Sequence, residues 1–176
     1  MSNRNYDIPG LALINHEILV EARRLGHLEE ATTNILGKPN YAALKEFNIF
    51  NQAQTMSLLY CVLLVPKELW MDSQDAPIYD EIRAYEPERL FTIEKSSKEH
   101  RKDPAYWLIR NMRNALAHIN YEYETNAELT YMFWNVHKGD KNWEVKISSP
   151  NLEIFVNSVG SLLANKALEE RKKHKS

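Results

Sequence analysis

The feature that most constrains the fold is the stretch 107–118, which reads Trp-Leu-Ile-Arg-Asn-Met-Arg-Asn-Ala-Leu-Ala-His. Asp103 and Pro104 precede it, and these residues favour the N-cap and the first turn of a helix. At about 100° per residue, such a helix has two distinct faces. The apolar face, which we expect in the core, holds Leu108, Ile109, Met112, Ala115, Leu116 and Ile119. The opposite face holds Arg110, Arg113, Asn114, Ala117, His118 and Tyr121.

Apolar periodicity predicts three further helices. The first begins near residue 7, ends at the breaker sequence 37–40, and has its apolar stripe at Leu11, Ile14, Ile18, Ala22, Leu25 and Leu28. The second spans about residues 41–65. Its second half, 58–65, is apolar nearly all round, so we expect it at the middle of a bundle or against a partner subunit. The last begins at Ser149-Pro150, with an apolar stripe at Leu152, Phe155, Val156, Val159, Leu162 and Leu163.

A β-hairpin is predicted between the polar-faced helix and the last helix. Segments 129–136 and 143–148 are rich in aromatic and β-branched residues, and they flank a turn that contains Gly139 and Asp140. Residues 75–85 predict a short helix that Pro87 ends. The fold class expected is therefore mainly α, a helical bundle with a small β-hairpin before the C-terminal helix. We expect one domain over residues 1–176, with flexible tails at 1–6 and about 170–176.

Two charged segments allow more than one interpretation. Residues 94–102 read as a solvated loop or as a basic flap that touches substrate beside the polar-faced helix. The run 169–175 is typical of a frayed soluble terminus, and less so of an arm that binds RNA. The hairpin, too, either packs on the helices or contributes contacts to a partner.

Composition limits the classes of function. A net charge of −2 argues against coating nucleic acid by bulk electrostatics, so any RNA must be handled at a local basic site or be a small target. The single cysteine, Cys61, allows no disulfide within the chain and fits a reducing compartment. The N-terminus has no secretory pattern, and the apolar run 58–65 is much shorter than the ~20 residues that span a bilayer. We expect a cytoplasmic protein without a membrane partner.

Arg113, Asn114 and His118 carry a family resemblance. An arginine that is followed directly by a polar residue, with a histidine separated from the arginine by four residues, resembles the signature of the HEPN superfamily. The resemblance implies a small helical bundle that dimerises through its motif helices, so that two copies face each other over one composite site. It also implies metal-independent endoribonuclease activity of the kind found in toxin–antitoxin and antiviral systems. RNA and an antitoxin or other defence-system protein are then the expected partners.

The residue types suit RNA cleavage without a metal. We expect His118 to act as general base or acid, because imidazole titrates near neutral pH. Arg113 is expected to hold the phosphate with its planar guanidinium, and Asn114 to orient the histidine. Arg110 and Tyr121 are expected to contact RNA. No cofactor is expected, and no metal site, because the other histidines lack partners at ligand spacing: His16, His27, His100, His137 and His174. The alternative is a catalytically inactive helical protein that binds RNA, nucleotide or a protein partner.

Overall fold

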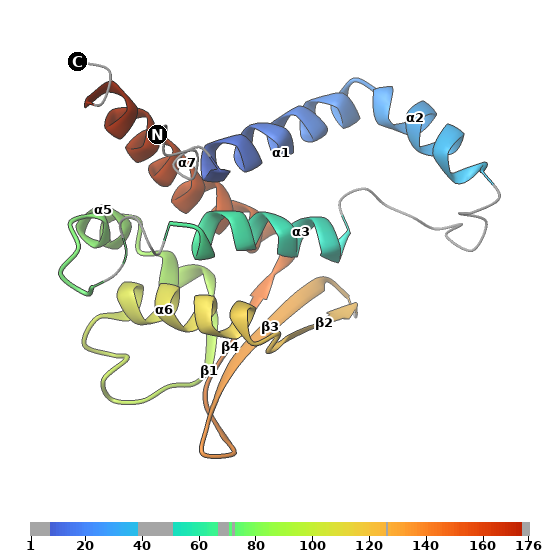
Figure 1. Cartoon of the computed structure of the whole chain (residues 1–176). Coiled ribbons are helices and arrows are strands. Elements are labelled where there is room, and N and C mark those ends of the chain that lie inside the picture. Colours follow the sequence, from blue (N-terminus) through green and yellow to red (C-terminus); the bar gives the residue numbers. More distant parts are fainter. Residues whose placement is uncertain (1–7, 39–50, 67–70, 72, 126, 174–176) are drawn as a thin grey trace.

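The computed structural model describes residues 8–38, 51–66, 71, 73–125 and 127–173. Within these ranges the chain forms six α-helices, two short helices of other types and one four-stranded antiparallel sheet (Figure 1). The helices are α1 (Ile8–Arg24), α2 (His27–Leu36), α3 (Gln52–Leu59), the π-helical η3 (Tyr60–Leu64), α5 (Ile78–Ala84), the 3₁₀ helix η4 (Pro87–Leu90), α6 (Pro104–Ala117) and α7 (Ser149–Lys173). The strands are β1 (Thr92–Lys95), β2 (Tyr121–Thr125), β3 (Leu129–His137) and β4 (Asp140–Ser148).

The sheet is larger than the sequence predicted. The predicted hairpin is present as β3 and β4, and its turn consists of Lys138 and Gly139, whose φ angles are 51° and 91°. Two edge strands extend it to the order β1-β4-β3-β2. The predicted helices and hairpin are therefore present, but the larger sheet makes the chain mixed α/β rather than mainly α. Both edge strands are largely exposed, so they lack the buried apolar face by which a strand is normally recognised.

One face of the sheet packs against the helices. Trp143, Val145 and Ile147 alternate along β4 and are at most 2% exposed, as their spacing predicted. The predicted stripe of α7 is buried throughout, from Leu152 to Leu163. The helix α3 continues directly into η3. Leu59 at the end of α3 and Val62 and Leu63 in η3 are fully buried, and η3 contacts α1, α6 and α7. The part of the predicted second helix before residue 51 lies outside the described residues.

The helix α6 is held at both of its ends. At its start the carboxylate of Asp103 accepts a hydrogen bond from the backbone N–H of Tyr106 (3.3 Å) and pairs with Arg83 (2.6 Å). This confirms the predicted N-cap. At its end the N–H of Asn120 donates to the carbonyl of Ala115 (2.8 Å), and that of Ile119 donates to the carbonyl of Leu116 (3.1 Å). This is a Schellman arrangement, in which the residue after the cap is left-handed.

That left-handed residue is Ile119, with a φ of 57°. The helix consequently ends at Ala117, with His118 as its C-cap, and the chain turns away. Ile119 is 70% exposed instead of lying in the core, so its predicted place on the apolar face is wrong. Tyr121 is likewise not on the helix. It begins β2, where its ring lies 6.2 Å from that of Phe133.

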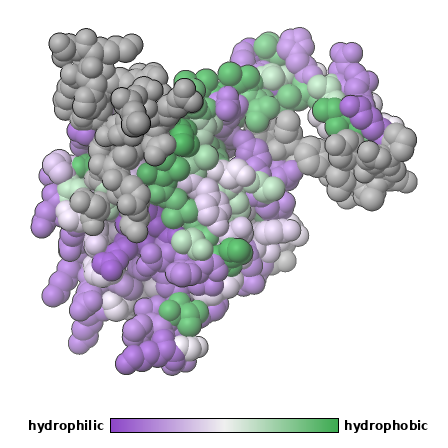
Figure 2. Space-filling model, in the orientation of Figure 1, coloured by the Kyte–Doolittle hydropathy of each residue, from purple (hydrophilic) through white to green (hydrophobic). Residues whose placement is uncertain are grey.

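The first predicted helix is broken in two, and its apolar stripe is mostly exposed. Gly26, with a φ of 76°, separates α1 from α2. The buried residues of α1 are Pro9 and Leu13, and Leu13 packs within 3.5 Å of the Cβ position at Gly160 in α7. The predicted stripe residues Leu11, Ile14, Ile18 and Leu25 are each more than half exposed. The two helices form an arm that extends from the body (Figure 1), and apolar side chains show on its surface (Figure 2).

The helix α7 includes the C-terminal charged run as far as Lys173, and the rest of the run lies outside the described residues. Among the described residues, no helix combines the length and the apolar character that a membrane span requires.

Candidate functional site

A polar groove of about 820 Å³ lies along the exposed side of α6. Three parts of the chain build it: the loop before α6, the helix itself with the turn that follows, and the β3–β4 hairpin. Its lining residues are Ser97, Glu99, His100, Trp107, Arg110, Asn111, Asn114, His118, Asn120, Asn135, Val136, His137 and Asn142. Three imidazoles, several carboxamides and one guanidinium thus face a single hollow.

The helix contributes one continuous stripe to the groove. Trp107, Asn111, Asn114 and His118 follow one another at steps of three and four residues, so their side chains lie on one face. Asn114 and His118 are exposed, and His118 occupies the C-cap position, where its N–H donates to the carbonyl of Asn114 (3.1 Å). The motif therefore places an imidazole and a carboxamide next to each other in the wall of the groove.

Arg110 lies beside this stripe and is held by two aromatic rings. Its guanidinium carbon is 4.9 Å from the ring centroid of Trp107, and its Nη1 donates to the hydroxyl of Tyr106 (3.1 Å). Stacking and hydrogen bonding restrict a side chain that would otherwise sample many rotamers. The groove thus has an exposed cation in a defined position, which suits a phosphate oxygen.

Arg113 is not in the groove. It is 6% exposed, and its Nη1 donates to the backbone carbonyl of Met71 (3.2 Å) on the other side of α6. The guanidinium is close enough to Tyr79 to oppose, by its charge, the increase that burial causes in the pKa of that tyrosine. The expectation that Arg113 lies on the open polar face with His118 is therefore wrong. Its long side chain follows the buried side of the helix instead.

A family model for HEPN pEK499 p136 matches residues 2–170. The chain belongs to this HEPN family. HEPN proteins are generally associated with RNase activity in defence and toxin systems. Neither the curated proteins nor the solved structures contain a match to the chain.

Of the residues expected at the HEPN site, the structure brings Arg110, Asn114 and His118 together. It separates from them Arg113, which is buried, and Tyr121, which lies on β2 and does not line the groove. Ala117 is exposed at the end of α6, as its place on the polar face predicted.

Sequence reasoning missed several residues that share this groove: Trp107, Asn111, His100, Asn135 and His137. The helical spacing of Trp107 and Asn111 relative to His118 could have identified the first two. His100 and His137 come from a loop and a hairpin, and only the folded chain brings them beside α6. The interpretation of residues 94–102 as a segment beside the motif helix is supported for Ser97, Glu99 and His100.

Asn111 and Asn135 form a buried link between α6 and β3. The Nδ2 of Asn135 donates to the backbone carbonyl of Asn111 (3.1 Å) and to its Oδ1 (2.9 Å). Both residues are buried, and both line the groove. The hairpin wall is therefore fixed to the motif helix by polar groups that belong to the groove itself.

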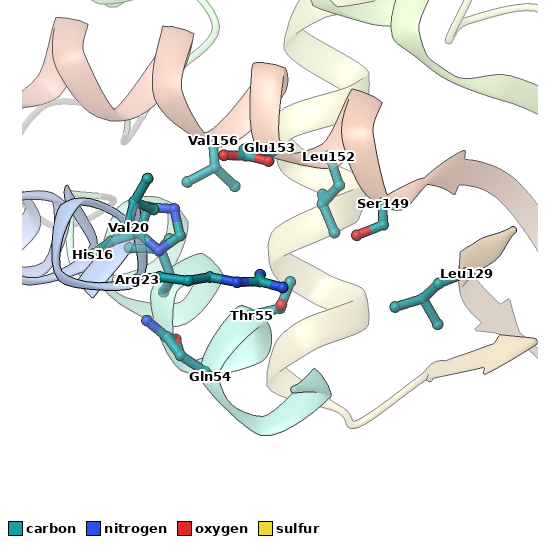
Figure 3. A pocket seen from close by; sticks show the side chains of 11 residues that line it. His16, Val20, Arg23, Gln54, Thr55, Leu129, Ser149, Leu152, Glu153 and Val156 are labelled. Atoms are coloured by element: carbon teal, nitrogen blue, oxygen red, sulfur yellow. The ribbon is translucent and has the colours of Figure 1, made fainter. Parts of the chain in front are cut away.

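A second cavity, of about 370 Å³, lies between α1, α3 and α7 (Figure 3). His16, Val20 and Arg23 reach it from α1, Gln54 and Thr55 from α3, and Glu153 and Val156 from α7. No residue of α6 lines it. Its walls mix aliphatic and polar side chains, and it shares none of the HEPN motif residues. The described residues contain no cluster of three or more His, Cys, Asp or Glu side chains suited to a metal ion.

Proposed function

We propose that this HEPN protein is a metal-independent endoribonuclease of a toxin–antitoxin or antiviral defence system. The observation that supports it best is that Asn114 and His118 of the motif open onto a polar groove that also contains a positioned guanidinium, Arg110. Phosphodiester cleavage needs these groups: an imidazole to move protons and a cation to stabilise the charge on phosphorus.

In the proposed reaction, the 2′-hydroxyl of RNA loses its proton to an imidazole and its oxygen attacks the adjacent phosphorus. The bond from phosphorus to the 5′-oxygen breaks, and the leaving oxygen takes up a proton from a second donor. His118 serves as one of the two proton-transfer groups, and Asn114 orients it. Arg110 holds a non-bridging phosphate oxygen. The second imidazole comes from His118 of another copy or from His137 in the same groove.

A homodimer through α6 is part of the proposal. Ala117 and Ile119 flank His118 in the sequence and are both exposed, and this small residue and this apolar residue give two motif helices a place to approach closely. Two-fold pairing there brings two copies of His118 to one composite site. An antitoxin or other defence-system protein as a further partner, and a site of action in the cytoplasm, remain predictions.

The catalytic role of Arg113 also remains a prediction. Arg113 is buried in the protomer, and Arg110 is the guanidinium that faces the groove. A mutation test of Arg113 must therefore separate a contact with phosphate from a structural role. If Arg113 contacts phosphate, Arg113→Lys lowers cleavage without lowering stability. If it holds α6 to Met71, the same change lowers the melting temperature, and the loss of cleavage follows from that.

The test is RNA cleavage in EDTA by wild-type protein and by folded variants. We expect His118→Ala to reduce the rate by about 10²–10⁴-fold, the usual contribution of a general acid or base. The matched control is His27→Ala, which removes an exposed imidazole from α2, outside the groove, and should leave the rate unchanged. Equal rates for wild type and His118→Ala would contradict the assignment.

A binding protein without catalysis is the second candidate, and the burial of Arg113 is the observation that favours it. In that case wild-type protein cleaves neither total RNA nor tRNA. Arg110→Ala would then weaken RNA binding, while His118→Ala would leave that binding almost unchanged.

A further inference from the structure

His100 is held in one orientation by the loop that carries it. The backbone N–H of Ser97 donates to its Nδ1 (3.1 Å), and its ring packs at 4.9 Å from the ring of Trp107. An imidazole nitrogen that accepts a hydrogen bond carries no proton, so the neutral ring bears its proton on Nε2. Burial lowers the pKa of His100, as does the nearby charge of Arg110, while Glu99 raises it. The neutral form, with Nε2–H, is therefore favoured near neutral pH.

The amide of Asn111 is also fixed in orientation. Asn135 donates from one nitrogen to the backbone carbonyl of Asn111 and to the side chain of Asn111, and a backbone carbonyl can only accept. The side-chain atom of Asn111 that faces Asn135 must then be its oxygen. Its NH₂ group faces His100 instead, at 3.5 Å from Nε2.

Two hydrogen-bond donors thus converge, and no acceptor from the part of the chain that the structure describes lies between them. The Nε2–H of His100 and the Nδ2–H of Asn111 cannot bond to each other, because both present a hydrogen. Asn111 is only 6% exposed and lines the groove, so its amide has little access to bulk water. An oxygen atom with two lone pairs, placed in the groove between the two nitrogens, satisfies both donors.

We propose that His100 and Asn111 form a subsite that binds an acceptor oxygen of the RNA nucleotide beside the scissile bond. The idea rests on the proposed function and adds to it a contact outside the motif. The oxygen is either a non-bridging phosphate oxygen, for which Arg110 adds charge, or a base carbonyl, for which the neutral donors suffice. Glu99 also lines the groove, and its charge disfavours the phosphate.

The direct test follows the imidazole resonances of His100 by NMR in the wild-type chain. Three probes are titrated separately: inorganic phosphate, guanosine and uridine. A shift of the Nε2–H signal with phosphate alone identifies a phosphate subsite, and a shift with either nucleoside alone identifies a base-carbonyl subsite. No shift with any probe at millimolar concentration would overturn the proposal.

A matched pair of variants extends the test to RNA. His100→Asn keeps an acceptor for the N–H of Ser97 but removes the distal donor, whereas His100→Gln keeps a donor at the Nε2 position. We expect His100→Asn to weaken binding of a short RNA about fivefold to tenfold, measured by fluorescence anisotropy in the His118→Ala background, and His100→Gln to restore most of it. Equal affinities for the two variants would contradict the subsite.

Because this binding measurement uses a protein without the proposed catalytic imidazole, it is independent of cleavage. If wild-type protein cuts no RNA but the two His100 variants differ in affinity, the ribonuclease proposal fails and the subsite stands. If wild-type protein cuts RNA and the two His100 variants bind it equally, the subsite proposal fails and the ribonuclease proposal stands.

Discussion

The helices α6 and α1 have the same kind of apolar periodicity, but the apolar stripe of α6 is buried and that of α1 is mostly exposed. The α6 residues Ile109, Met112 and Leu116 are completely buried, and both ends of the helix are capped by described contacts. In α1, three of the stripe residues, Leu11, Ile14 and Ile18, are more than half exposed. An apolar stripe therefore predicts a helix reliably, but it does not say whether the same chain covers that stripe.

The largest expected difference between the two helices is in core truncation. Ile109→Ala removes a fully buried side chain from α6 and should lower the free energy of unfolding by about 2–5 kcal/mol. Ile18→Ala removes a side chain that is 60% exposed and should change it by no more than about 0.5 kcal/mol. Chemical denaturation of both variants measures the contrast.

If Ile18→Ala is as destabilising as Ile109→Ala, the apolar stripe of α1 is not exposed in solution as it is in this structure. A loss that grows with protein concentration would mean that another copy of the chain covers α1 in solution, because association stabilises the folded state by mass action.

The N-terminal cap of α6 gives the next largest effect. Asp103→Ala should cost about 1–2 kcal/mol of stability, because the cap and the pairing with Arg83 are lost together. Glu21→Ala on α1 removes an exposed ion pair with Arg24 and should cost less than about 0.5 kcal/mol.

The contribution of Asp103 has a defined pH dependence. The hydrogen bonds from Arg83, chiefly, lower the pKa of Asp103 below its ordinary value of 3.8. A carboxyl whose pKa is lower in the folded state stabilises the protein above its unfolded pKa, and that stability is lost as the pH falls through the folded value. Thermal melts between pH 7 and pH 2 should show wild type and Asp103→Ala converging below about pH 4.

The smallest effects come from two left-handed residues, one at each helix. Ile119→Gly removes a β-branched residue from the left-handed region after α6 and should raise stability by about 1 kcal/mol. Gly26→Ala introduces a side chain at a φ of 76° between α1 and α2, where space is free, and should lower stability by about 1 kcal/mol. Melting temperatures that move in the same direction for both would show that one of the two backbone turns differs in solution.

The parts of the fold that could be predicted were those that depend on the residue pattern of a single helix or strand. The stripe of α7, the alternation along β4 and the Asp103 cap of α6 each depend on neighbouring residues in the sequence, and all three are confirmed. The edge strand β2 was missed even though Tyr121, Tyr123 and Thr125 alternate with glutamates, because the helix was extended past Ala117. The Schellman turn at an isoleucine gave no glycine signal for that ending.

The site was predictable only in part, for a similar reason. His118, Asn114 and Arg110 share one side of a helix, and helical geometry alone brings them together. Arg113 is at the edge of the predicted polar face, and the direction of its side chain depends on an acceptor at Met71, far away in the sequence. His100 and His137 could not have been placed in the groove without knowing how the loop and the hairpin pack on α6.

The three-part wall of the groove has a consequence for synthesis of the chain. The motif helix is complete at Ala117, but Asn135, His137 and Asn142 on the opposite side are translated later, and α7, which covers the sheet, later still. A ribosome-bound chain that has emerged only as far as His118 contains every residue of the motif but lacks the groove onto which Asn114 and His118 open. If the protein cuts RNA, its own translation machinery is exposed to a finished cutting site only after the hairpin has left the exit tunnel and folded.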